Sequence, residues 1–293
     1  MLGVVLVAAA GWWSVNWYLH RAPVRDGAPN WSPDGRSIVF YSERGGAADL
    51  FVMDDKGEGV RQVTNTPADE GAPAFSPDGK LIAYDTDRDG NYEIYTIGAD
   101  GLGPRRLTRH PGRDLAPAWA PDGSKIIFMS DRDARPEFDI YRMNPDGSAV
   151  ERLTTKPTNW FPQYSPDGRR LAMHVWRDVH VMDLTTKALK RLTYDPLNGM
   201  YPTWSPDGNR LAFMSSRNGA TELFTMKADG TDQQRVVTMP RGSAIDPRWS
   251  PAGDRLVFVH VPEENAQDDQ AASQQRIIYV AELATGKLTR LSR

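Results

Sequence analysis

Short apolar runs alternate with polar turns along almost the whole chain, and the same order of runs returns six times. In the second copy the apolar runs are residues 81–84 and 94–97, and the turn Asp100-Gly101 follows them. Runs of this length, rich in branched and aromatic side chains and separated by turn residues, are typical of β-strands. Each copy holds four such runs, which predicts units of four antiparallel strands.

A five-residue turn marks the start of every copy. It reads aromatic-Ser-Pro-Asp-Gly with small changes, and its prolines are Pro33, Pro77, Pro121, Pro166, Pro206 and Pro251. Pro-Asp-Gly favours a tight turn, because proline presets φ, aspartate caps nearby amides and glycine accepts a positive φ. The prolines lie 44, 44, 45, 40 and 45 residues apart. This period predicts an all-β, six-bladed β-propeller of four-stranded antiparallel blades over residues 29–293.

The repeat resembles the Pro-Asp propeller repeat of the TolB family. The shared features are Pro-x-Trp-Ser-Pro-Asp-Gly, an apolar strand, Ser-x-Arg, Ile-Tyr-x-Met and a closing Leu-Thr. The resemblance covers residues 29–293 and implies a binding scaffold that receives partners at the mouth of its channel. TolB carries an α/β domain before its propeller, and we expect none here, since residues 1–28 are too few.

Strand order predicts which face of the disc carries function. The Pro-Asp-Gly and Asp-Gly turns are short and lie on one face, which we call the turn face. The loops between second and third strands, and between blades, lie on the other, which we call the loop face. Binding residues usually sit on varied loops of a rigid scaffold. We therefore predict a protein or peptide partner on the loop face, contacting Trp160, Phe161, Trp176, Met200, Tyr201 and Asp114. The alternative is that the aromatic side chains plug the channel.

The arginine that ends the second strand recurs as Arg44, Arg88, Arg132 and Arg217. A residue required by most copies usually serves the fold of the copy, so we expect it to pair with a carboxylate or carbonyl group rather than to bind an anion. Asp85 to Gly90 resembles the start of a calcium loop, but position twelve is Thr96 and strands flank it, which favours a polar hairpin.

No catalytic motif is present, and we expect no catalytic residues, no metal and no cofactor. His174 and His180 flank the hairpin of the fourth copy, but no third ligand accompanies them, and packing is the stronger interpretation. A polysaccharide-active enzyme with a histidine metal cluster is a remote alternative, and only His174, His180 and His260 would supply it.

Composition narrows the partners. Net charge is -3 with both signs interspersed, so no nucleic-acid footprint is visible, and there is no cysteine for disulfides or lipid attachment. Residues 1–21 are apolar and then aromatic, which predicts a signal peptide or membrane anchor, joined by a linker at residues 22–28. The polar segment 262–275 of the sixth copy is expected to be a mobile loop.

These features predict a monomeric, non-enzymatic TolB-like scaffold, periplasmic or anchored to a membrane and facing the periplasm. The main alternative is the sensory ectodomain of a longer membrane protein.

Overall fold

A computed structural model of the chain describes residues 24–133, 137–155, 159–194, 199–263 and 275–292. The expected membrane or signal segment at 1–21 and most of the expected mobile loop at 262–275 lie outside these ranges. Within them, no helix is long and apolar enough to cross a membrane.

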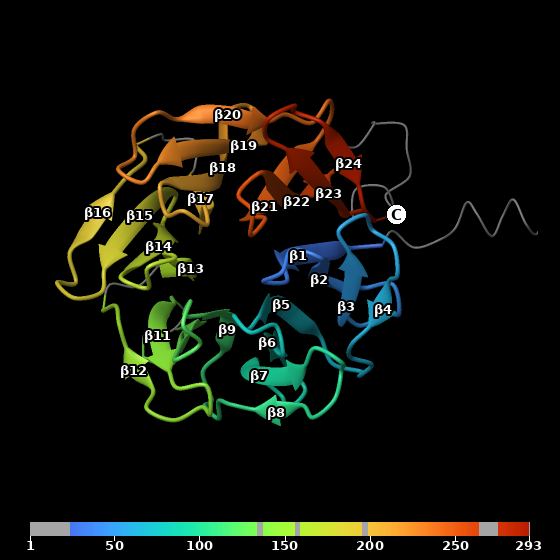
Figure 1. Cartoon of the computed structure of the whole chain (residues 1–293). Helices are drawn as coiled ribbons and strands as arrows, with labels where there is room; N and C mark the ends of the chain where they lie inside the picture. The colour runs from blue at the N-terminus through green and yellow to red at the C-terminus, as the bar shows by residue number, and fades with distance from the viewer. Residues whose placement is uncertain (1–23, 134–136, 156–158, 195–198, 264–274, 293) are drawn as a thin grey trace, which may run out of the picture.

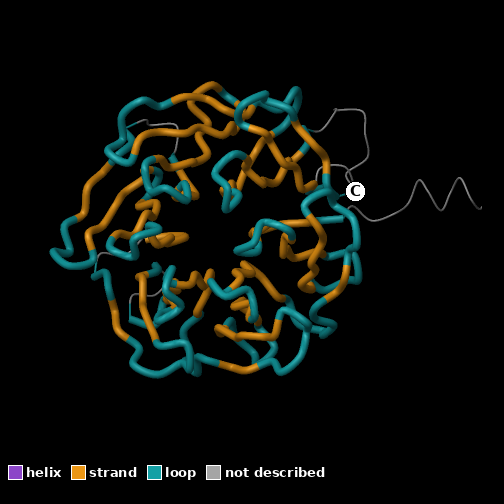
Figure 2. Tube along the Cα trace, in the orientation of Figure 1, coloured by secondary structure: helices purple, strands orange, loops and turns teal. Residues whose placement is uncertain are grey.

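The strands form six separate four-stranded antiparallel sheets arranged around a centre, so the predicted six-bladed propeller is confirmed (Figures 1 and 2). Blades one and two are β1 (Asp26–Trp31), β2 (Ser37–Ser42), β3 (Asp49–Asp54), β4 (Arg61–Gln62), β5 (Glu70–Phe75), β6 (Leu81–Thr86), β7 (Glu93–Gly98) and β8 (Arg105–Arg106). Blades three and four are β9 (Asp114–Trp119), β10 (Ile126–Ser130), β11 (Asp139–Met143), β12 (Glu151–Arg152), β13 (Asn159–Tyr164), β14 (Arg170–Val175), β15 (Asp178–Asp183) and β16 (Leu189–Arg191). Blades five and six are β17 (Met200–Trp204), β18 (Arg210–Asn218), β19 (Ala220–Lys227), β20 (Gln234–Val237), β21 (Ser243–Trp249), β22 (Arg255–Val261), β23 (Ile277–Glu282) and β24 (Leu288–Arg290).

The Pro-Asp-Gly turn holds the first two strands of a blade together. In blade one the Ser32 hydroxyl donates to Asp34 Oδ1 at 2.6 Å, the Arg36 amide donates to the same oxygen at 3.1 Å, and Gly35 has a φ of 70°. These donors lower the pKa of Asp34, since they stabilise its ionised form. Blade six has Ala252 at the Asp position, and there Ser250 donates instead to Asp254 at 2.8 Å.

The first strand of every blade lies nearest the centre (Figure 1). Each of these strands carries a β-bulge directly before the proline inside the strand, which is Pro29 in β1. The bulged residue has a φ between 42 and 53° in all six blades: Ala28, Ala72, Ala116, Phe161, Tyr201 and Asp246. A bulge bends a strand and redirects a side chain. All of these except Tyr201 line a small cavity at the centre, which receives alanines from blades one to three, Phe161 from blade four and Asp246 from blade six.

Among the described residues the ring closes without an exchanged strand, because β21 to β24 all come from the sixth copy, and Arg25 makes one isolated bridge to Arg276 of blade six. Packing joins the ends: Trp31 and Phe51 of blade one share a buried cluster with Ile278 of blade six. An ion pair of 3.0 Å between Arg255 and Asp55 also crosses this junction.

The recurrent arginine has the structural role predicted for it. Arg132 donates to Asp114, a fully buried carboxylate at the start of β9, at 2.7 Å. Its guanidinium lies 4.9 Å from the Tyr141 ring centroid. Arg44 with Asp26 and Arg88 with Glu70 repeat the ion pair in blades one and two.

Candidate functional site

Trp176 is the most exposed large apolar side chain among the described residues, with 74% of its surface accessible. It occupies the two-residue turn between β14 and β15, on the loop face, with a φ of 57°. Such turns normally carry Asn or Gly at positive φ, and a bulky residue there is an outlier. Glycine or asparagine would adopt this backbone conformation with less strain than tryptophan does.

A second exposed aromatic side chain, Tyr194, lies in the segment that leads from β16 toward blade five, and 72% of it is accessible. The Arg191 guanidinium lies 4.7 Å from its ring centroid. The other strongly exposed apolar side chain among the described residues is Leu102, which lies on the turn face. Exposed aromatic surface on the loop face is thus concentrated on blade four.

Trp160, Phe161 and Tyr201 are half-buried and pack with His174 into one aromatic cluster. The ring centroids of Phe161 and Tyr201 are 4.2 Å apart, and those of Trp160 and His174 are 6.4 Å apart with nearly parallel planes. Burial alone lowers the pKa of His174 to about 4, and its Nδ1 accepts the Tyr201 amide at 3.4 Å. This neutral histidine packs against all three aromatic rings.

Two other predicted contact residues have different surroundings. Met200 is half-buried against the cluster between blades five and six. Asp114 is fully buried and bound to Arg132, as described above, so its carboxylate is committed to the blade. Trp176 is therefore the residue of the predicted set that is freely presented, and Trp160, Phe161, Met200 and Tyr201 offer partly accessible edges.

The histidines do not converge. In the β14–β15 pairing His174 is opposite Val179 and His180 is opposite Met173, so the two imidazoles project from opposite faces of the blade. His260 Nε2 lies 2.7 Å from the Arg241 carbonyl oxygen in blade six. Within the part of the chain that the structure describes, no three His, Asp or Glu side chains are grouped to hold a metal.

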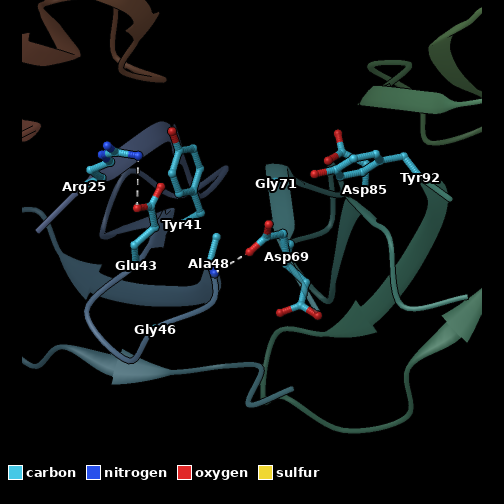
Figure 3. Close-up of a pocket in the computed structure, with 10 residues that line it drawn as sticks. Arg25, Tyr41, Glu43, Gly46, Ala48, Asp69, Gly71, Asp85 and Tyr92 are labelled. Atoms are coloured by element: carbon cyan, nitrogen blue, oxygen red, sulfur yellow. Dashed lines mark hydrogen bonds and ion pairs between the residues drawn. The ribbon is translucent and has the colours of Figure 1, made fainter. Parts of the chain in front are cut away.

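A pocket of about 410 Å³ opens on the loop face between blades one and two (Figure 3). We call it the acidic pocket, because four acidic side chains and one arginine line it: Glu43, Asp69, Glu70, Asp85 and Arg25. The tyrosines Tyr41 and Tyr92 form opposite sides of it (Figure 3). Desolvation raises the pKa of Asp85 to about 6.

Sequence reasoning missed Asp85 and Tyr194 as site residues. Asp85 belongs to the segment interpreted as a polar hairpin, and its turn is indeed closed by a bond from the Gly90 amide to the Asp87 carbonyl at 2.8 Å. A comparison of the six copies could have identified Asp85, since the equivalent residue in the other copies is Tyr, Met, His, Met or Val. Tyr194 follows the closing Leu-Thr of its blade and had no such contrast.

The chain matches the TolB beta propeller domain family over residues 58–175 and 155–286, and it belongs to that family. Among curated proteins it is 42% identical over 38 residues to the Tol-Pal system protein TolB of Syntrophus aciditrophicus. That match covers 13% of this chain and 8% of the relative. It is 48% identical over 40 residues to the uncharacterized peptidase YuxL of Bacillus subtilis, which covers 13% of this chain and 6% of the relative. The matched segments thus span less than a tenth of either relative.

Solved structures show the same architecture. The TolB of Acinetobacter baumannii is 27% identical with a TM-score of 0.69, over 78% of this chain and 57% of that chain. A putative TolB from Agrobacterium tumefaciens has the same TM-score at 23% identity, over 79% of this chain and 83% of that one. An oligogalacturonate lyase in complex with manganese has a TM-score of 0.64 at 14% identity, over 93% and 78% of the two chains, which shows a shared fold alone.

Proposed function

We propose that this protein is a non-enzymatic, TolB-like scaffold of the bacterial cell envelope, whose loop face binds a protein or peptide partner. The observation that carries the proposal is Trp176, a 74% exposed tryptophan held at a φ of 57°. Backbone strain and exposed aromatic surface both cost free energy. Features of that kind cluster at binding sites, where the partner compensates for them.

The relatives suggest the setting for this partner. One is named as a Tol-Pal system protein, and the family match covers most of the propeller. We propose that the partner belongs to a Tol-Pal type system and that the chain faces the periplasm.

Trp176→Ala is expected to weaken partner binding about tenfold or more, because a buried tryptophan anchor contributes about 2 kcal/mol or more. The full chain would be used to capture proteins from the envelope fraction of its host. The dissociation constant of the recovered partner would then be measured with purified components.

Leu102→Ala is the matched control, since Leu102 is 71% exposed but lies on the turn face. It should leave both binding and melting temperature unchanged. Equal affinity of Trp176→Ala and the unaltered chain would show that blade four is not the binding surface. Loss of affinity in both variants would point to a non-specific apolar contact.

Cell fractionation tests the proposed location. The full chain is expected in the periplasmic or membrane fraction, because its first 21 residues have the apolar and aromatic pattern of an export or anchor segment. A chain that begins at Arg21 should stay in the cytoplasm. Equal cytoplasmic recovery of the two would contradict the proposed location.

A further inference from the structure

Asp85 is the unusual residue of the acidic pocket, because it is 5% exposed and only partly hydrogen-bonded. Its Oδ2 accepts the Ala116 amide of blade three at 2.8 Å. Its Oδ1 has no hydrogen-bond donor among the residues that the structure describes. This oxygen is not fully enclosed by protein atoms, so it is open to the pocket and can accept a hydrogen bond from a group that enters it.

The repeat itself does not require an acid at this position. The equivalent residue is Tyr41, Met129, His174, Met214 or Val259 in the other blades. Two of these side chains make the same bond to the next blade: Met129 accepts the Phe161 amide at 2.9 Å, and His174 accepts that of Tyr201. A neutral acceptor therefore performs the structural task, and the charge of Asp85 is an addition particular to blade two.

The neighbouring strand leaves room in front of this carboxylate. Gly71 lies opposite Asp85 in the β5–β6 pairing, and a Cβ at Gly71 would lie 2.7 Å from Asp85 Oδ1. The absence of a side chain there keeps the free oxygen open to the pocket. With a volume of about 410 Å³, the pocket is within the usual range of sites for small groups.

The other charges of the pocket also favour a cation. Glu43 forms a 3.5 Å ion pair with Arg25 at the rim, and Asp69 Oδ1 accepts the Ala48 amide at 2.9 Å (Figure 3). Glu70 is already paired with Arg88 at 2.9 Å and Glu43 with Arg25, so Asp69 and Asp85 are the lining acids that no described arginine pairs with. The two tyrosine rings supply electron-rich faces that attract a cation and an apolar surface for its alkyl stem.

We propose that the acidic pocket binds the protonated side chain of a lysine or arginine presented by the partner, with the Asp85 carboxylate as its acceptor at the inner end. That this side chain belongs to the protein partner rests on the proposed function, whereas the binding of a cation in the pocket does not. Burial raises the pKa of Asp85 to about 6. Neutralisation by a cation would remove part of the cost of ionising this carboxyl group.

A titration with a defined peptide tests the pocket. The isotope-labelled full chain would be titrated at pH 7 with a five-residue peptide of glycines around one central lysine, and with the same peptide carrying Nε-acetyllysine. We expect saturable shifts of the Gly71 and Ala116 amide resonances, because the Ala116 amide is bound to Asp85. The acetylated peptide should bind about tenfold more weakly or worse, since it cannot form a charge-assisted hydrogen bond.

Two variants locate the contact. Asp85→Asn should weaken lysine-peptide binding about tenfold or more, and Gly71→Ala should weaken it by filling the space before Oδ1. Glu58→Gln removes an exposed acid from the β3–β4 turn on the turn face and should leave binding unchanged, which controls for net charge. Both pocket variants must keep the unaltered spectrum outside the pocket.

Several results would overturn the proposal. These are no shift with the lysine peptide, equal binding of the acetylated peptide, or full binding by Asp85→Asn. Shifts with calcium or manganese ions but not with the lysine peptide would make the pocket a metal site instead. Because the titration uses a purified chain and a defined peptide, it reports on the pocket even if Trp176 proves irrelevant to partner capture.

Discussion

Replacing Arg132 by alanine is expected to lower the free energy of unfolding by about 3–5 kcal/mol, because it leaves the Asp114 carboxylate buried without its counter-charge. Asp114 is fully buried and Arg132 is 13% exposed, so solvent screens the 2.7 Å pair little. The change also removes the guanidinium from the faces of Phe128 and Tyr141. Denaturant unfolding at pH 7 would measure the loss.

Protonation of Asp114 gives this prediction a second readout. Burial already raises the pKa of Asp114 even beside Arg132, and removal of the arginine should raise it further. A carboxyl group whose pKa is raised in the folded state destabilises the fold most when it is ionised. The loss of unfolding free energy in Arg132→Ala should therefore shrink as the pH falls from 7 toward the pKa of Asp114 in the unfolded chain. Adding Asp114→Asn should recover much of the stability.

The exposed pair in the same blade is the control. Arg142 and Glu151 are 2.6 Å apart, but their side chains are 28% and 51% exposed. Arg142→Ala should therefore cost about 1 kcal/mol or less. Similar losses for the two arginine variants would mean that burial of the carboxylate is not what makes the Arg132 pair important.

The blade architecture was predictable because the signals for it are local and repeated. Pro33-Asp34-Gly35 specifies its own turn through contacts within five residues, and six copies in register fix the number of blades. The structural role of the recurrent arginine was predictable for the same reason. A feature found in most copies serves what the copies share.

The candidate site was only partly predictable, because exposure depends on contacts between blades. Trp160 and Trp176 are similar in sequence terms, yet the first packs on Phe138 with ring centroids 4.9 Å apart and the second is open to solvent. The bulge in the first strand recurs in all six blades, but the contact between Phe161 and Tyr201 joins two neighbouring blades, which no pattern within one copy specifies. Asp114 illustrates the reverse case. The sequence pattern places it in a polar loop, but in the structure it is fully buried and paired with Arg132.

Departures from the repeat therefore carry more functional information than the repeat. Asp85 and His174 occupy equivalent positions, and both accept an amide of the next blade. Burial acts on them in opposite senses: it raises the pKa of the acid to about 6 and lowers the pKa of the base to about 4. Both shifts disfavour the charged form, and they have opposite consequences for stability as pH changes.

Asp85→Asn is expected to raise the free energy of unfolding at pH 7 by about 2–3 kcal/mol. The folded carboxyl group has a pKa of about 6, against 3.8 as the reference value, so between these values the folded state binds more protons and loses stability as pH rises. Asparagine keeps an oxygen for the Ala116 amide and carries no charge. The gain should vanish near pH 4.

His174→Asn should show the opposite dependence on pH. Neutral His174 has a folded pKa of about 4 against a reference of 6.5, so the unfolded state binds more protons between these values, and the histidine withdraws stability as pH falls. The variant loses the ring stacking of His174 and should be less stable than the unaltered chain at pH 7. This difference in unfolding free energy should shrink by about 3 kcal/mol on acidification to pH 4. In the unaltered chain the two slopes nearly cancel over this window. Parallel unfolding curves from pH 4 to 7 for both variants and the parent would show that neither group is desolvated as the structure has it.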